Sequence, residues 1–384
     1  MTLAVTPLLE LIGAQAQQAD QTRSISAAVI SGLKGNEIMG FTAAQELGGT
    51  DQSAVRVGLE LEAVAARCTS TAWVLWNHLA TFHLFAGMLG PQNQAQLRDV
   101  VIRNQWVCFP AGASTGIRAE VDGDQVVLTG KAAFGSGARY AEWAGAAFVM
   151  AGEDKPSFAL VSLDQSGVRI DADWNAMSLR ASATDTVYYE EARVEASRVV
   201  PFHFMYRRLF RNADYQVIHA RYREDWIGLS NAWLGMMAVG VVSAALDEVA
   251  MGIKDRIAIA GVKIAERPTV HVNLGHAKAK VQAARDTVLA ACGEADERIA
   301  ADMAPDEDDY LRQLGAATTA LILCDDALRL IQRVMGGNGL REGVDFERRL
   351  RDFQAMPLHI NAHQDRVSEQ IGRHVLGLPT VNPF

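Results

Sequence analysis

The chain has 384 residues, of which 49% are hydrophobic and 21% are charged, so it holds enough apolar material for two or three cores. Its net charge of −9 at pH 7 and the lack of any block of Lys or Arg exclude the basic surface that nucleic acids or anionic membranes require. We therefore expect a globular, multi-domain protein whose partners are small molecules and copies of itself.

The cysteine pattern and the N-terminus bear on location. The four cysteines lie far apart and form no Cys-x-x-Cys pair, which favours neither a zinc site nor a disulfide framework. We expect no metal and a reducing, cytoplasmic environment. Residues 1–20 lack a basic start followed by a long apolar run and a small-residue cleavage site, so they predict an amphipathic helix and no signal peptide.

The period of the hydrophobic pattern changes along the first half of the chain. Residues 25–35 and 55–89 repeat apolar positions every three or four residues, which predicts helices. After about residue 105 the period becomes two, in short runs rich in Val, Phe, Tyr and Thr that turn formers separate. These runs are residues 124–134, 145–152, 157–163 and 186–194. They predict a small β-barrel or sandwich inserted between helical regions.

Helical periodicity returns near residue 212 and predicts a C-terminal four-helix bundle. Its four long segments are residues 226–246, 271–300, 308–336 and 361–377. The predicted fold class is therefore α+β and mostly α. The predicted domains are an N-terminal helical domain at 1–104, a middle β domain at 105–212 and the bundle at 213–384.

The segment 226–246 has no charged residue and is long enough to be weighed as a membrane span, since about 20 apolar residues can cross a bilayer. Ser230, Asn231 and Ser243 interrupt it, and the helical pattern continues into charged sequence. A helix that is apolar all round also fits the centre of a large core or an interface between subunits. We predict a buried bundle helix at the core of a homotetramer, and no membrane.

Several short motifs are weak alone but specific in their order and spacing. Residues 41–49 read FTAAQELGG, residues 240–247 read GVVSAALD, residues 335–339 read MGGNG and residues 348–352 read RRLRD. In this order they resemble the acyl-CoA dehydrogenase family over nearly the whole chain. That resemblance implies helices, then a β domain, then a four-helix bundle.

The segment 348–364 departs from that family at the catalytic base. Where an acyl-CoA dehydrogenase has a catalytic Glu after its Arg-Asp pair, this chain has Ile360, with His359 one place before it. FPAGASTG at 109–116 and FGSG at 134–137 also resemble the flavin-dependent monooxygenase branch of the superfamily. The resemblance implies the oxygenase component of a two-component monooxygenase that takes reduced flavin, FADH2 or FMNH2, from a separate reductase and hydroxylates a phenol, an indole or a fused-ring compound.

Such chemistry uses O2 and a flavin hydroperoxide that must stay dry and hydrogen-bonded. Ser136 lies between Gly135 and Gly137, and the glycines let its hydroxyl and backbone approach the flavin edge closely. We predict that Ser136 has a catalytic role at the flavin. The alternative is an ordinary turn after a strand.

Hydroxylation of an aromatic ring also needs a base for the substrate OH or NH near neutral pH, which suits histidine. His359 is the first candidate, because Pro357 can begin a helix and the positive end of that helix would keep the imidazole neutral. By resemblance His78, in an aromatic stretch with Trp73 and Trp76, is a substrate-pocket histidine. For both histidines the alternative is packing in a core.

The resemblance implies two sets of flavin contacts. Within one chain the set comprises Phe109, Ala111, Gly112, Ser136 and Gly137. From a neighbouring subunit it comprises Arg267, whose guanidinium suits a phosphate, with Gly336 and Gly337. The alternatives for this second set are a solvated loop arginine and a helix C-cap. If the second set binds flavin, the enzyme cannot work as a monomer.

Three other functions stay open. The chain would be a true acyl-CoA dehydrogenase if Asp225 or Glu224 served as a relocated base. Oxygenation at a sulfur or nitrogen atom is possible on the same fold, and a non-catalytic flavin-binding homologue is the third possibility. The substrate and the choice between FMN and FAD are not determined by these residues.

Overall fold

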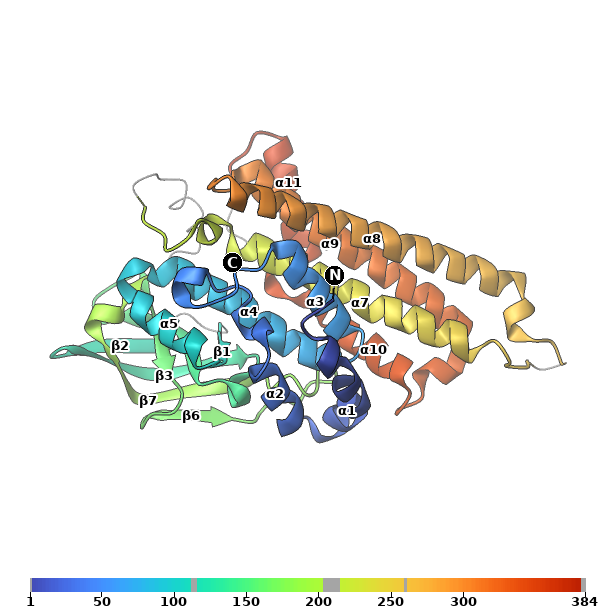
Figure 1. Ribbon diagram of the computed structural model, residues 1–384, viewed down its shortest axis with the longest axis horizontal. Helices are drawn as coiled ribbons and strands as arrows, with labels where there is room; N and C mark the ends of the chain where they lie inside the picture. The colour runs from blue at the N-terminus through green and yellow to red at the C-terminus, as the bar shows by residue number, and fades with distance from the viewer. Residues whose placement is uncertain (1, 112–115, 203–214, 259–260, 381–384) are drawn as a thin grey trace.

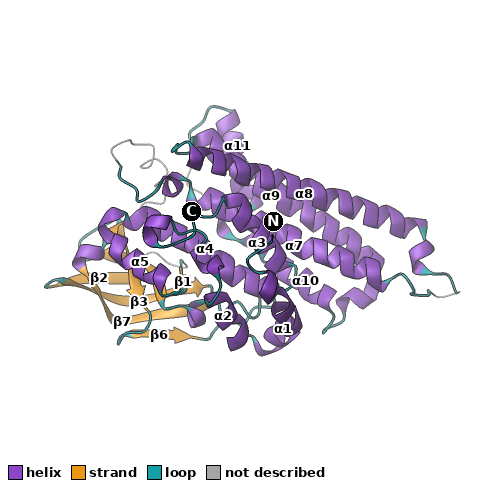
Figure 2. Ribbon diagram, in the orientation of Figure 1, coloured by secondary structure: helices purple, strands orange, loops and turns teal. Residues whose placement is uncertain are grey.

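The computed structural model describes residues 2–111, 116–202, 215–258 and 261–380. An N-terminal set of helices, a β-sheet and a C-terminal bundle follow one another along the chain (Figure 1). This is the mostly helical α+β architecture predicted above. Figure 2 shows the sheet at one end of the molecule and the long bundle helices extending away from it.

The N-terminal helices surround one central helix. They are α1 (Leu9–Thr22), α2 (Ala27–Lys34), α3 (Ala54–Ala65), α4 (Thr69–Leu89) and α5 (Gln94–Ile102). The hydroxyls of Ser26 and Ser53 accept hydrogen bonds from the third residue after them, so they start α2 and α3 as N-caps. Every residue of α4 except Asn77 is buried. Because α4 contacts both strand β1 and the bundle helix α7, its side chains can join the two halves of the molecule.

Eight strands form one sheet in the order β6-β7-β3-β2-β4-β5-β8, with β1 paired to β4. They are β1 (Val107–Cys108), β2 (Ile117–Asp122), β3 (Gln125–Gly135), β4 (Trp143–Met150), β5 (Pro156–Ser162), β6 (Val168–Asp171), β7 (Asp185–Glu195) and β8 (Val200–Pro201). The antiparallel β3 and β7 are the longest strands, and their register pairs Gly135 with Asp185. This pairing brings the turn after β3 beside the segment before β7.

The bundle consists of three long helices and two short ones. They are α7 (Trp226–Gly252), α8 (Pro268–Ala300), α9 (Glu307–Met335), α10 (Asp345–Phe353) and α11 (Gln364–Val375). The four predicted segments correspond to α7, α8, α9 and α11. The helix α10 was missed because ion pairs, more than apolar residues, hold its buried face. Arg349 pairs with Glu248 of α7, and Arg351 pairs with Asp20 of α1.

By length and composition alone, helix α7 could cross a membrane. No other helix among the described residues is both long and apolar enough to do so. It packs against α3, α4, α8 and α9, and 67% of its most apolar window is buried within this one chain. The prediction of a buried bundle helix is therefore confirmed. Its role in a tetramer stays a prediction.

Candidate active site

Three parts of the chain meet at two tryptophans of α4. Trp73 and Trp76 are three residues apart, so they lie on the same face of the helix. The ring centroids of Trp73 and Trp76 are 5.7 and 5.1 Å from that of His359, in edge-on arrangements. The indole N–H of Trp73 also donates to Ser136 Oγ at 3.0 Å. The structure thus brings two predicted catalytic residues, Ser136 and His359, into contact with one tryptophan.

Ser136 lies in the tight turn that follows β3. Gly137 has φ +79°, and a Cβ there would stand 2.8 Å from Val74 Cγ1, so the position requires glycine. The Ser136 hydroxyl is buried and lies 3.0 Å from Thr184 Oγ1, which in turn lies 2.6 Å from Ser182 Oγ. Ser136 in this turn is thus connected to two hydroxyls of the segment before β7, beside the aromatic side chains of α4.

His359 has an extended backbone between two single-turn 3-10 helices, Met356–Leu358 and Ile360–Ala362. The predicted place in the first turn of a longer helix is therefore wrong: Pro357 starts only one turn, which ends at His359. The pKa of His359 is lowered to about 4 by burial of the ring, and not by a helix dipole as predicted. Its Nδ1 atom is buried and has no hydrogen-bond partner among the described residues. The imidazole is neutral at pH 7 and has a nitrogen to offer a ligand.

Further acceptors lie close to His359. Asn231 of α7 donates from Nδ2 to the backbone carbonyl of Asn361 at 2.7 Å. The Oδ1 atoms of Asn231 and Asn361 are buried, and no protein group in the described part of the chain pairs with them. Because unpaired buried acceptors are costly, this corner suits a ligand that carries an OH or NH donor.

His78 is held by the backbone at both ring nitrogens. Nδ1 accepts a hydrogen bond from the N–H of Val107 at 3.1 Å, which leaves Nε2 to donate to the carbonyl of Met39 at 3.1 Å. Burial lowers the pKa of His78 to about 4, so the ring is neutral. It braces α4 against β1 and has no nitrogen left for a substrate. We therefore leave His78 out of the catalytic set.

Two of the predicted flavin contacts within one chain, Phe109 and Ala111, flank Pro110, whose Cβ lies 3.2 Å from the place of a Cβ at Gly135. Gly112 falls outside the described residues, and Ala111 is exposed at the end of the described loop. The ring of Phe109 packs edge-on against Phe158 at 5.9 Å and Trp226 at 6.1 Å between centroids. Phe109 is thus part of the core that supports this loop.

A test of fit for flavin comes from the buried donors at this turn. The indole N–H of Trp106 is buried without a partner among the described residues. Its Nε1 atom lies 3.4 Å from the point that a Cβ atom would occupy if Gly137 had a side chain. Together with the Ser136 hydroxyl it offers hydrogen-bond donors. A flavin ring edge carries oxygen and nitrogen acceptors, so these residues fit that group.

The second predicted set, Arg267, Gly336 and Gly337, lies elsewhere. Arg267 precedes α8 and the two glycines follow α9, and all three are exposed. Both helix ends are at the tip of the bundle that is remote from the sheet (Figure 1). One chain therefore does not bring this set to Ser136, and its part in a flavin site shared between subunits stays a prediction.

The two carboxylates considered as relocated bases are both engaged. Glu224 is buried and accepts hydrogen bonds from Arg298 and Gln313, each at 2.7 Å. Burial is the largest influence on its pKa, which is raised. Asp225 is the N-cap of α7, where its Oδ1 accepts from the backbone N–H of Ile227 at 2.8 Å. Both carboxylates are thus used in hydrogen bonds and ion pairs within the protein.

Sequence reasoning missed the roles of Trp73, Ser182 and Thr184. Trp73 was noted only as part of the aromatic surroundings of His78, because helical spacing does not show which neighbour an indole N–H will find. Nothing in the spacing links Thr184 to Ser136, since they meet only through the pairing of β3 with β7. Small hydroxyl residues just before a strand are a weak signal.

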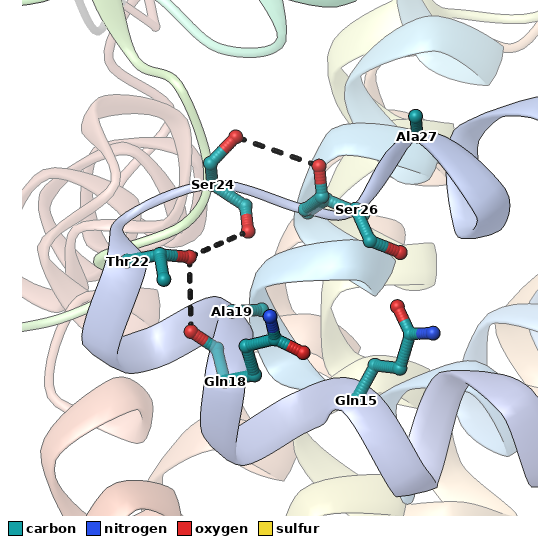
Figure 3. Close-up of a pocket in the computed structure, with 8 residues that line it drawn as sticks. Gln15, Gln18, Ala19, Thr22, Ser24, Ser26 and Ala27 are labelled. Carbon is teal, nitrogen blue, oxygen red and sulfur yellow. Dashed lines mark hydrogen bonds between the residues drawn. The ribbon is translucent and has the colours of Figure 1, made fainter.

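A hollow of about 190 Å³ lies elsewhere, between α1 and α2 (Figure 3). Its lining is Gln15, Gln18, Ala19, Thr22, Ser24, Ile25, Ser26 and Ala27. These side chains include no acid, base or aromatic ring, and Thr22 already donates to the carbonyl of Gln18 at 3.0 Å. The hollow has no group for the predicted chemistry, so we do not assign it a catalytic role.

Comparison with known proteins is consistent with this geometry. Residues 232–364 match the family model for the acyl-CoA dehydrogenase C-terminal domain. The chain is 27% identical to a pigment production hydroxylase from Rhodococcus sp., over 99% of this chain and 97% of that protein. It is 24% identical to the oxygenase component of an FADH2-dependent resorcinol hydroxylase from Rhizobium sp., over 97% and 93% of the two chains.

Solved structures show the same fold. XiaF from Streptomyces sp., in complex with FADH2 and glycerol, superposes with a TM-score of 0.89 and 19% identity over 98% of this chain and 95% of its own. The 3-HSA hydroxylase from Rhodococcus sp. RHA1 gives a TM-score of 0.87 and 21% identity over 99% and 97%. The likeness covers the sheet and the bundle together, and so the whole region in which Ser136 and His359 meet.

Proposed function

We propose that this chain, which belongs to the acyl-CoA dehydrogenase superfamily, is the oxygenase component of a two-component flavin-dependent monooxygenase that hydroxylates a small aromatic molecule. The observation that carries the proposal is the place of His359. A neutral, half-buried imidazole whose Nδ1 has no partner among the described residues lies one place before Ile360, the position at which the resemblance puts the dehydrogenases' carboxylate, and it faces the tryptophans of α4. Two relatives, named a pigment production hydroxylase and a resorcinol hydroxylase, support the same reaction class.

His359 would act on the substrate OH or NH. With a pKa near 4 the imidazole stays neutral and accepts a hydrogen bond without retaining the proton at neutral pH. Accepting that bond increases the electron density of the aromatic ring, which is what oxygen transfer to carbon needs. The free Oδ1 atoms of Asn231 and Asn361 offer further acceptors to a substrate that carries donors.

Ser136 and Trp106 would hold the flavin edge, with Gly137 allowing its close approach. When bound, reduced flavin supplies the electrons that let one atom of O2 enter the ring while the other leaves as water. Trp73 and Trp76 exclude water and offer flat apolar faces to an aromatic substrate.

The remaining partners follow from this reaction. A separate reductase would supply FMNH2 or FADH2, and we place the enzyme in the cytoplasm. Arg267, Gly336 and Gly337 would bind the flavin phosphate of a neighbouring copy in a homotetramer, because their exposed position at the bundle tip leaves them no role at their own chain's site. The guanidinium geometry suits a phosphate.

One assay tests the reaction class. Purified chain is mixed with FMNH2 or FADH2 and O2, and products from a phenol, indole, organic sulfide and acyl-CoA panel are identified by mass spectrometry. We expect a hydroxylated phenol or indole and no reaction with the thioester. A sulfoxide would favour heteroatom oxygenation. Reduction of tightly bound oxidised flavin by the acyl-CoA would contradict the proposal and favour a dehydrogenase.

A further inference from the structure

We infer that Trp73 and Thr184 are positioning residues that make the Ser136 hydroxyl a donor, and only a donor, toward the bound flavin. The inference rests on the proposed function in one respect, that Ser136 faces the cofactor. It otherwise depends on a chain of four buried polar groups. Trp73 Nε1 lies 3.0 Å from Ser136 Oγ, Ser136 Oγ lies 3.0 Å from Thr184 Oγ1, and Thr184 Oγ1 lies 2.6 Å from Ser182 Oγ.

The indole sets the first constraint on Ser136. An indole N–H can donate a hydrogen bond but cannot accept one, whereas a hydroxyl has one hydrogen and two lone pairs. The contact between Trp73 and Ser136 therefore always uses one lone pair of the serine oxygen. The serine hydrogen can point only to Thr184 or into the site.

Three arrangements of the hydroxyl hydrogens are then possible. If Ser136 and Ser182 both donate to Thr184, the Thr184 hydrogen has no partner among the described residues, which is costly. The other two arrangements pass the hydrogens along the chain of hydroxyls in a single direction. If Ser136 donates to Thr184, then Thr184 donates to Ser182, and the last hydrogen ends on Ser182. Ser182 has no exposed surface, and the described residues offer its hydroxyl no partner other than Thr184. This order leaves a buried donor unpaired, which is costly.

The opposite order leaves no buried hydrogen unpaired once a ligand is present. Ser182 donates to Thr184, Thr184 donates to Ser136, and Ser136 donates into the site. Both lone pairs of Ser136 are then occupied, one by Trp73 and one by Thr184. The hydroxyl can only offer its hydrogen, so it selects an acceptor atom of the ligand and disfavours an N–H or O–H group at the same point.

A double-mutant cycle on flavin affinity tests this coupling without turnover. The affinity for oxidised FMN and FAD is measured by flavin fluorescence, with no reductant or substrate present. We expect Ser136→Ala, Thr184→Val and Trp73→Phe each to weaken binding by about 3–10-fold, the range for one lost hydrogen bond. In the Ser136→Ala background the other two substitutions should have no further effect, because both act through that hydroxyl.

The controls separate the hydroxyl chain from general packing. Thr184→Ser keeps the hydroxyl and should restore affinity. Thr186→Val removes another hydroxyl of the same region, one that donates to Asp173 at 2.7 Å, and should leave affinity unchanged. Trp143→Phe is the control for Trp73→Phe. It removes an indole N–H that donates to Gln105 at 2.8 Å, and it should leave flavin affinity unchanged.

Two results would overturn the inference. One is an equal loss of affinity from Thr184→Val with and without Ser136, and the other is no loss from Thr184→Val in the wild-type chain. If Trp73→Phe does not fold, the Thr184 variants alone decide between these outcomes. The affinity measurements involve no oxygen transfer. If the three substitutions prove coupled but the chain hydroxylates none of the test compounds, the proposed function is refuted and the inference stands.

Discussion

The carboxylate of Asp352 accepts a hydrogen bond from the backbone N–H of Leu179 at 2.7 Å, and this bond ties α10 to the segment before β7. Ser178 strengthens the tie by donating to the backbone carbonyl of Asp352 at 3.2 Å. Arg351, the adjacent residue, binds Asp20 of α1 at 2.9 Å. The Arg-Asp pair thus anchors the start of the segment that carries His359 to both the sheet region and the N-terminal helices.

We predict that Asp352→Ala lowers the free energy of unfolding by about 1–3 kcal/mol, the cost of leaving a buried donor unpaired. Urea denaturation followed by circular dichroism measures this change. Asp365→Ala, at an exposed position on α11, is the control and should change stability little. Equal stability of the Asp352→Ala variant and the wild type would show that the tie to Leu179 contributes nothing.

Buried histidines predict a loss of stability in mild acid. Burial lowers the pKa of His78 and His359 to about 4 and that of His83 to about 3. Above pH 6.5 these rings are neutral in both the folded and the unfolded chain, so they do not change the free energy of unfolding with pH. Below pH 6.5 the unfolded chain binds protons that the folded chain does not, so stability falls as the pH drops toward 4.

Asp352 opposes this trend, because burial raises its pKa to about 6 and the folded chain then gains protons first between pH 6 and 4. Burial also raises the pKa of Asp185, Glu224 and Asp296, which adds to this opposition. The three histidines should outweigh these carboxyls between pH 7 and 5, because the unfolded imidazoles, with a pKa of about 6.5, bind their protons first. We therefore expect a lower urea midpoint at pH 5 than at pH 7. His276→Gln, at an exposed position on α8, should leave the difference unchanged, and a higher midpoint at pH 5 would contradict the burial argument.

Replacement of His359 should separate oxygen consumption from product formation. We predict that His359→Ala keeps flavin binding but lowers hydroxylation by about 10²–10⁴-fold, the usual range for loss of an acid–base group. O2 would then be consumed with release of hydrogen peroxide. His276→Ala is the matched control on an exposed face. A variant that hydroxylates at the wild-type rate, or one that binds no flavin, would remove His359 from its assigned role.

The pH profile of hydroxylation gives an independent check on His359. Because burial lowers the pKa of His359 to about 4, the imidazole should remain an acceptor across pH 5 to 8. We expect that the hydroxylation rate does not decrease with a midpoint near pH 6.5 as the pH is lowered. A decline centred near 6.5 in the wild type, absent from a His359 variant, would show that the ring is solvated during the reaction.

Mixed oligomers test whether the flavin site is shared between copies. Arg267→Ala and Ser136→Ala should each lower the activity measured at limiting flavin concentration, because each weakens flavin binding. Co-expressed, they form hybrids in which one site combines Ser136 of one chain with Arg267 of the other, so part of the activity should return. Light scattering on the same samples reports the oligomeric state. A lack of recovery in confirmed hybrids would show that both residues act within one chain.

Much of the fold could be predicted because local pattern and packing agree. The two-residue period between 105 and 201 identified the β region, and the absence of charge from 226 to 246 identified the buried α7. Helix α10 escaped because Arg349 and Arg351 are buried by partners more than 100 residues away in sequence. Periodicity detects an apolar face, and it does not detect an ion-paired one.

The candidate site divides in the same way. Residue identity and order were enough to place Ser136 in a glycine turn and to find His359 next to Ile360, the position at which the resemblance puts a catalytic carboxylate. The folded chain was needed to show that both side chains meet at Trp73, that the backbone occupies both nitrogens of His78, and that Arg267 lies at the remote bundle tip. Hydrogen-bond partners are set by strand register and helix packing, which join residues that sequence spacing leaves far apart.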